Sequence, residues 1–267
     1  MGIRIETVVT GGFQMDYFRF GSGERALVIL PGLSIQSVCG FADAVAAAYA
    51  SMAEDFTVYV FDRRRELPAV YTVADMAEDT AAAMEALDLR GVSLFGASQG
   101  GMIAQLIAIR HPALVGRLVL GSSSSHVTEA QFAVIGRWIA LARQGDRAGL
   151  YLDFGEKIYP PALFAQLKDS LLAAAETVTG RDLARFVILA EGIRGFNITG
   201  QLDKIQCPVL AIGVYEDAVL DADATMEIAE KLDERIDFRL YMYTGFGHAA
   251  FDTAPDYRER MRRFLEA

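Results

Sequence analysis

The sequence is poor in the residue types that build disulfide frameworks and metal sites. Its 267 residues include two cysteines, Cys39 and Cys207, far apart and in apolar surroundings, and three scattered histidines. So few cysteines and histidines, so widely separated, argue against a disulfide framework and against a cysteine-based or zinc site. The His-Glu-x-x-His pattern and the phosphate-binding loop are also missing. We therefore expect no metal and no cofactor.

Two loose Gly-x-Gly-x-x-Ala patterns do not change this expectation. The first begins at Gly21 and comes before an expected strand, whereas a dinucleotide-binding motif follows one. The second begins at Gly245 and follows a strand, but too little chain remains after it for a complete βαβ unit. We interpret both as loops.

Basic charge is also in short supply. There are 25 Lys and Arg residues against 35 Asp and Glu residues, which gives a formal net charge of −10 and a pI near 4.8. This balance argues against nucleic acid or an anionic membrane as a partner. The most apolar long stretch, 92–109, is interrupted by polar residues, and residues 1–20 lack the pattern of a signal peptide. We expect a cytoplasmic monomer or homodimer acting on a small-molecule substrate.

Short apolar segments recur along the chain and predict a sheet. Residues 3–10 and 13–20 alternate apolar and polar side chains around Gly11-Gly12, which predicts an edge hairpin. Continuous apolar runs predict strands buried on both faces, at 26–30, 56–61, 92–95, 117–120, 208–213 and 238–243. Between several of these strands, apolar residues recur at helical spacing, which predicts amphipathic helices. The sequence therefore predicts an α/β fold with a mostly parallel eight-stranded sheet and helices on both faces.

The alternation stops between 125 and 202. A connection between a strand and a helix in such a fold is usually about two to six residues long, so this stretch is an insertion. It has helical patterns of its own, such as Phe132, Ile135 and Ile139. We predict a helical cap at 125–202, inserted after the sixth strand, and a core made of 1–124 and 203–267.

A serine flanked by glycines follows the strand predicted at 92–95. Gly96-Ala97-Ser98-Gln99-Gly100 fits Gly-x-Ser-x-Gly, the turn from strand to helix that exposes a nucleophilic hydroxyl. Apolar residues at helical spacing come after it. The pattern predicts Ser98 as a nucleophile, and such a nucleophile needs a histidine base oriented by a carboxylate.

Of the three histidines, His248 is the best candidate for the base. His111 lies 13 residues along the same helix, about 20 Å away at 1.5 Å per residue, and reads as a helix end. His126 opens the insertion and is interpreted as a loop residue, with a substrate contact as the alternative. His248 lies in a glycine-containing loop after the last strand, which can carry an imidazole over the sheet edge.

Asp217 is the preferred acid, with Glu216 as the alternative. Both come at the end of the 208–213 strand, where open α/β sheets place their sites. Asp221 and Asp223 are better explained as helix caps. For the oxyanion hole, the expected backbone donors are the N–H groups of Gln99 and of Leu33, which follows Pro31-Gly32.

With these residues placed, the chain resembles the α/β-hydrolase superfamily, in particular its capped esterase, aminopeptidase and haloperoxidase-like members. The resemblance covers most of 1–124 and 203–267 and includes Asp62, which we interpret as a loop-bracing residue. Serine at the turn separates the chain from the dehalogenase and epoxide-hydrolase branches, which have aspartate there. Two departures are Pro31-Gly32 in place of His-Gly, and Arg63-Arg64-Arg65 in place of a Gly-rich turn. We interpret the arginines as a solvated loop, with carboxylate binding as the alternative.

The expected function is that of a cofactor-free serine hydrolase, a carboxylesterase for small to medium apolar esters. Alternatives with the same fold are C–C bond hydrolysis, aminopeptidase action, perhydrolysis and acyl transfer. The alternative that is not an enzyme is a ligand-binding protein with the same fold and little or no turnover. Two or three cap aromatics are expected to face the substrate, out of Trp138, Tyr151, Phe154, Tyr159, Phe164, Phe186 and Phe196.

Overall fold

The sheet has eight strands, as the sequence predicted. The computed structural model describes residues 2–267, so residue 1, the first of the predicted core, lies outside the described residues. The strand order is β1-β2-β4-β3-β5-β6-β7-β8, and only the β1–β2 and β2–β4 pairs are antiparallel. The strands are β1 (Ile5–Val9), β2 (Gln14–Phe20), β3 (Arg25–Leu30), β4 (Phe56–Arg64), β5 (Val92–Ala97), β6 (Val115–Gly121), β7 (Val209–Val214) and β8 (Phe238–Tyr243).

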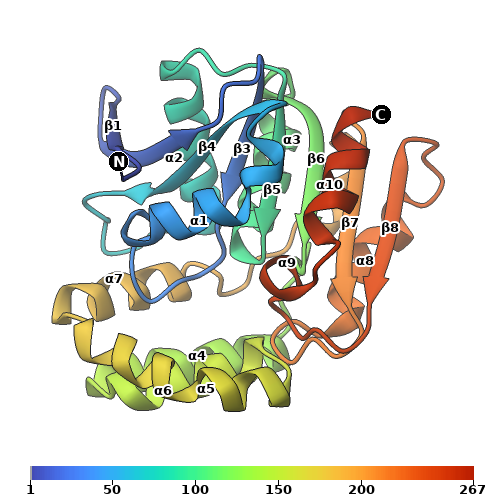
Figure 1. Ribbon diagram of the computed structural model, residues 1–267. Coiled ribbons are helices and arrows are strands. Elements are labelled where there is room, and N and C mark those ends of the chain that lie inside the picture. The colour runs from blue at the N-terminus through green and yellow to red at the C-terminus, as the bar shows by residue number, and fades with distance from the viewer. Residues whose placement is uncertain (1) are drawn as a thin grey trace.

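Helices cover both faces of this sheet (Figure 1). Buried side chains of α2 (Val73–Ala86), α3 (Gln99–Arg110) and α8 (Asp221–Leu232) belong to one apolar core. Those of α1 (Ala42–Ala48), α9 (Ala250–Thr253) and α10 (Tyr257–Glu266) belong to a second core. The two-sided burial explains why the central strands are continuously apolar. Short 3₁₀ turns complete the layers, at Val38–Phe41, Ala50–Met52, Pro112–Leu114 and Thr199–Lys204.

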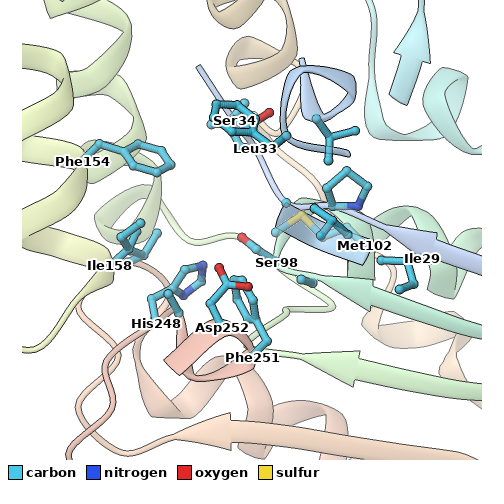
Figure 2. A pocket seen from close by; sticks show the side chains of 18 of the residues that line it. Ile29, Leu33, Ser34, Ser98, Met102, Phe154, Ile158, His248, Phe251 and Asp252 are labelled. Atoms are coloured by element: carbon cyan, nitrogen blue, oxygen red, sulfur yellow. The ribbon is translucent and has the colours of Figure 1, made fainter. Parts of the chain in front are cut away.

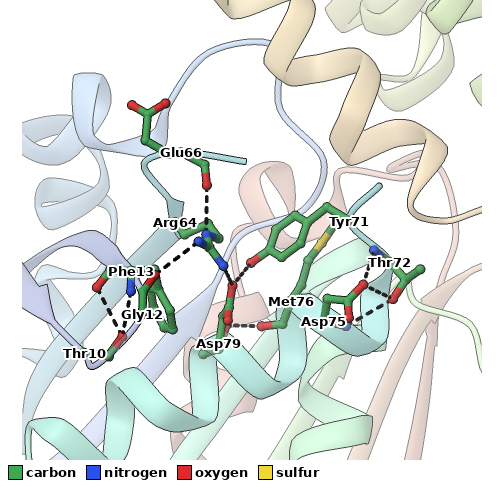
Figure 3. Close-up of polar contacts among 11 residues, drawn as sticks. Thr10, Gly12, Phe13, Arg64, Glu66, Tyr71, Thr72, Asp75, Met76 and Asp79 are labelled. Carbon is green, nitrogen blue, oxygen red and sulfur yellow. Dashed lines mark hydrogen bonds and ion pairs between the residues drawn. The ribbon is translucent and has the colours of Figure 1, made fainter. Parts of the chain in front are cut away.

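Local capping decides where several helices begin. At the start of α2, Thr72 Oγ1 accepts a hydrogen bond from Asp75 N, and Asp75 Oδ2 accepts one from Thr72 N (Figure 3). This capping box satisfies two donors that the first turn of a helix cannot pair internally. The same arrangement, Thr at the cap and Gln or Asp three residues later, starts two of the inserted helices.

Four helices lie between β6 and β7. They are α4 (Glu129–Gln144), α5 (Arg147–Ile158), α6 (Pro161–Thr177) and α7 (Gly180–Glu191), and together they are called the α4–α7 segment. Figure 1 shows the segment gathered at one end of the sheet rather than on either face. No helix within residues 2–267 combines the length and the apolar character needed to cross a membrane.

The turn between β5 and α3 is unusually crowded. A Cβ atom on Gly100 would lie 2.0 Å from the carbonyl oxygen of Leu30, and one on Gly96 would lie 2.3 Å from that of Gly100. Real Cβ atoms do not approach so closely, so these glycines allow the first turn of α3 to pack directly against β3 and β5.

This packing predicts a large difference between two glycine substitutions. Gly100→Ala should lower the free energy of unfolding by about 2–3 kcal/mol or prevent folding, because the methyl group meets fixed backbone. Gly136→Ala, inside α4 with nothing within 4 Å of the added Cβ, should raise it by about 0.5–1 kcal/mol. Urea unfolding of both variants measures the difference. Equal effects would contradict the argument.

Candidate active site

Ser98 occupies a strained backbone position at the carboxyl end of β5. Its φ is +51° and its ψ is −121°, in the region that L-residues rarely adopt. The conformation is held by a hydrogen bond from Ser98 N to Gly121 O of 2.8 Å and by the crowded packing of α3. Strain of this kind persists only where the surroundings enforce it, and it points the hydroxyl out of the turn.

The structure brings Asp217 and His248 together. Asp217 follows β7 and His248 follows β8, and Asp217 Oδ2 lies 2.7 Å from His248 Nδ1. The other oxygen, Asp217 Oδ1, accepts hydrogen bonds from Val219 N at 2.8 Å and Leu220 N at 3.0 Å. Both side chains are buried, so the carboxylate is fixed in place. An ionised Asp217 accepts a hydrogen bond from Nδ1–H, which leaves Nε2 of His248 as the basic nitrogen.

Ser98 and His248 line the same cavity (Figure 2). Within residues 2–267 no hydrogen bond joins Ser98 Oγ to the imidazole, whose hydrogen-bonded partner is Asp217. Glu216, the alternative acid, does not contact His248. It accepts a hydrogen bond from Gly245 N at 2.8 Å and so steadies the loop that carries the histidine.

The two predicted oxyanion donors flank the serine. Gln99 N opens helix α3, where the backbone N–H groups point out of the helix end. Leu33 lines the cavity, and the preceding Gly32 packs so closely that an added Cβ would lie 3.1 Å from Ser98 Cβ. The turn after β3 therefore lies against the nucleophile candidate.

The prediction that Arg63, Arg64 and Arg65 form a solvated loop is wrong for Arg63. Strand β4 continues to Arg64, and the Arg63 side chain is only 3% exposed. Arg63 Nη2 donates to Pro31 O at 2.9 Å and to Gln99 Oε1 at 3.2 Å. Burial lowers the pKa of Arg63 to about 10, so it stays charged at neutral pH. Arg63 thus joins the turn after β3 to the start of α3, the support that Pro31-Gly32 itself does not provide.

The Gln99 side chain carries this network on to the inserted helices. It is fully buried, and its Nε2 donates to Leu189 O of α7 at 2.7 Å. A second tie runs from Ala249 N to Ile158 O at the end of α5, at 2.9 Å. The α4–α7 segment is therefore bonded both to the serine turn and to the histidine loop.

The other two arginines make surface contacts. Arg64 donates to Glu66 O and lies 3.4 Å from Asp79, whose carboxylate also accepts from Tyr71 (Figure 3). Arg65 pairs with Asp16.

Asp62 contacts other parts of the chain. It accepts hydrogen bonds from Ser37 Oγ at 2.5 Å and Arg185 Nη2 at 2.7 Å. These contacts fit the loop-bracing role expected from the sequence.

The remaining histidines lie outside the cavity lining. His111 caps the end of α3, as expected, with Nε2 lying 3.0 Å from Glu78 Oε2. His126 is half-exposed, pairs with Asn197 in an isolated bridge and lies 4.0 Å from Glu227. Neither residue is placed to take a proton from Ser98.

The cavity has a volume of about 290 Å³ and is mainly apolar. One wall comes from the sheet and the turn after β3, and the other from the inserted helices. Of the seven aromatic residues considered from sequence, Trp138 and Phe154 line it, with ring centroids 4.5 Å apart. The inserted helices also contribute Ile135 and Ile158. A volume near the lower end of small-molecule sites favours small substrates.

One cavity residue, Asp252, was missed in the sequence. It lies on α9, four residues after His248, and its carboxylate points into the cavity beside Ser98 and His248 (Figure 2). Burial raises the pKa of Asp252 to about 6, against a smaller opposing effect of Arg258. Its place four residues after the predicted base was the signal that could have revealed it.

Comparison with known proteins agrees with this architecture. Residues 25–155 match the family described as alpha/beta hydrolase fold, and the whole chain superposes on solved members. The chain belongs to the α/β-hydrolase superfamily. The structure of MGS-M2, an alpha/beta hydrolase enzyme from a Medee basin deep-sea metagenome library, matches with a TM-score of 0.86. The match has 19% identity and covers 98% of each chain.

Two sequence relatives have somewhat higher identity over shorter alignments. "Serine hydrolase BPHL" of Mus musculus is 28% identical over 152 residues, which cover 51% of this chain and 51% of that protein. The chain therefore matches about half the length of this relative. "Putative carbamate hydrolase RutD" of Agrobacterium fabrum is 25% identical over 232 residues, covering 80% of this chain and 85% of that protein.

The Arg63 network predicts unequal effects of two neighbouring arginines. Arg63→Met should lower the free energy of unfolding by about 2–4 kcal/mol, because it leaves the buried Gln99 Oε1 without its donor. Arg65→Met removes only a surface ion pair and should change it by less than about 1 kcal/mol. Urea unfolding tests this. An Arg63→Met protein as stable as Arg65→Met would refute the proposed support.

The raised pKa of Asp252 predicts a pH-dependent stability difference. The folded protein holds the proton up to about pH 6, whereas the unfolded chain loses it near 3.8. Wild-type stability therefore falls, relative to Asp252→Asn, as pH rises from about 4 to 7. The Tm of Asp252→Asn minus that of wild type should increase over this range and then level off. A difference independent of pH would contradict the assignment; the exposed Asp203→Asn controls for general charge removal.

Proposed function

We propose that this protein is a serine hydrolase that acts on small to medium carboxylic esters through Ser98, His248 and Asp217. The observation that carries the proposal is the buried Asp217–His248 pair, joined at 2.7 Å, whose histidine lines the same cavity as Ser98 at its strained turn. Superfamily membership supports a hydrolase.

In the proposed reaction, Ser98 Oγ attacks the ester carbonyl carbon while His248 Nε2 takes the hydroxyl proton. Asp217 stabilises the imidazolium that forms, and the N–H groups of Leu33 and Gln99 stabilise the oxyanion. Collapse of the tetrahedral intermediate breaks the ester C–O bond, and His248 gives its proton to the leaving alcohol. Water then attacks the acyl-enzyme by the same route, releases the carboxylic acid and restores Ser98.

We also propose that 125–202 acts as a cap and shapes substrate choice. Trp138 and Phe154 supply much of the apolar wall opposite the sheet. The hydrogen bonds from Gln99 to Leu189 and from Ala249 to Ile158 couple these helices to the reacting groups. An apolar cavity of about 290 Å³ fits a short acyl or alcohol group.

Carbamates are the second substrate class to test, because a relative similar over 80% of this chain is named a putative carbamate hydrolase. Analysis of the products separates ester and carbamate hydrolysis from C–C cleavage, peptide hydrolysis, perhydrolysis and acyl transfer. Multiple turnovers that depend on Ser98 would distinguish any of these from a non-catalytic binding protein.

The proposal predicts a single covalent adduct on Ser98. Exposure of wild type to a fluorophosphonate probe should add the mass of one probe less HF, because Ser98 Oγ displaces fluoride at phosphorus, and the Ser98→Ala variant should stay unmodified. His248→Gln should retain its fold but lower turnover of a short-chain ester by about 10³-fold or more, because the serine loses its base. Intact-mass spectrometry and steady-state kinetics measure these effects.

His126→Gln is the matched control, since that imidazole lies outside the cavity lining. It should label and turn over like wild type. Labelling of Ser98→Ala, or near-normal turnover by His248→Gln, would remove the triad assignment. Folded wild type that neither labels nor turns over would favour the binding-protein alternative.

A further inference from the structure

The cavity has one charged feature that the proposed ester chemistry does not use. Among the described residues that line it, Asp252 is the only acid, and there is no lysine or arginine. Figure 2 shows its carboxylate directed toward Ser98 and His248, on the same side as the reacting groups. The remaining polar side chains, Ser34 and Gln36 among them, are neutral.

Asp252 has no partner that would explain its place as structural. Across residues 2–267, no side-chain hydrogen bond and no salt bridge within 4.0 Å involves its carboxylate. Arg258 favours its charged form only from a longer distance, with its guanidinium over the Tyr49 ring. Asp217, by contrast, has both oxygens paired. The Asp252 side chain is exposed and lies in the cavity lining, so its carboxylate is accessible to a cationic group that enters the cavity.

The position of this carboxylate disfavours substrates that carry no positive charge. An ionised Asp252 beside Ser98 repels the negative charge that develops on the carbonyl oxygen during attack. A cation bound between them removes that penalty and gains a charge-assisted hydrogen bond. A carboxylate on the substrate would instead face a second negative charge with no basic side chain in the cavity lining to balance it.

We propose that Asp252 is a specificity-determining residue that binds an ammonium group of the substrate, so that the cavity selects cationic compounds with an otherwise apolar body. Trp138 and Phe154, which line the same cavity, provide the apolar contact for that body. The nature of the bond that is cleaved rests on the proposed function, but binding of the cation does not require catalysis.

The first test measures binding without chemistry. Isothermal titration calorimetry at pH 7.5, above the pKa of Asp252, compares three probes of equal chain length: n-hexylammonium, 1-hexanol and hexanoate. Wild type should bind n-hexylammonium at least tenfold more tightly than 1-hexanol and should bind hexanoate most weakly, because hydrogen bonds to charged groups contribute about tenfold or more. Asp252→Asn, which keeps the shape but not the charge, should lose the preference for n-hexylammonium.

Asp203→Asn is the control, because it removes the same charge from an exposed position outside the cavity lining. It should keep the wild-type order of affinities. The proposal is overturned if Asp252→Asn binds n-hexylammonium as tightly as wild type does, if hexanoate binds as well as n-hexylammonium, or if none of the probes binds wild type at millimolar concentration.

The second test joins the binding site to the reaction. The ratio of kcat/KM for ethyl 6-aminohexanoate to that for ethyl heptanoate should fall at least tenfold in Asp252→Asn. An unchanged ratio would overturn the role in specificity. The two proposals fail separately: cation binding that depends on Asp252, without fluorophosphonate labelling, removes the hydrolase proposal alone. Labelling of Ser98 without any cation preference removes the role of Asp252 alone.

Discussion

The close approach of helix α3 to strands β3 and β5 is the constraint on which the rest of the site depends. Gly100 allows the helix backbone to reach within van der Waals contact of Leu30 O, where a side chain would not fit. This contact forces Ser98 into its positive φ and presents Gln99 N at the helix start. The same approach brings the Pro31-Gly32 turn against the serine. The nucleophile candidate and the predicted oxyanion donors are therefore consequences of one packing arrangement.

A connected network of buried hydrogen bonds holds this arrangement in place. Arg63 bonds the turn after β3 to Gln99, and Gln99 bonds to α7. The Asp217–His248 pair is similarly fixed by backbone N–H groups at the end of β7. In a buried setting such hydrogen bonds are strong and orient their members, whereas loss of one member leaves the others unsatisfied. The inserted helices join both parts and so connect the cavity walls with the reacting groups.

Charge is distributed unevenly around the cavity. Asp217 has both oxygens hydrogen-bonded, to its histidine and to two backbone donors, whereas the Asp252 carboxylate faces the cavity with no hydrogen-bond partner within residues 2–267. Two acids a short distance from one imidazole thus have different environments. In enzymes, that difference commonly separates an orienting role from a role toward substrate.

The sequence by itself determined the sheet, the glycine-flanked serine turn and the order serine, acid, histidine, because strand burial and tight turns have local signatures in residue type and spacing. It also predicted a helical insertion at 125–202 that interrupts the core. It did not predict that Arg63 is buried, because three consecutive arginines are typical of a solvated loop. In the structure β4 continues through Arg63 to Arg64, and the strand places the Arg63 side chain in the interior. Nor did it predict Asp252. The choice of Asp217 over Glu216, the burial of Arg63 and the direction of Asp252 depend on contacts between segments far apart in the chain, which only the tertiary structure decides.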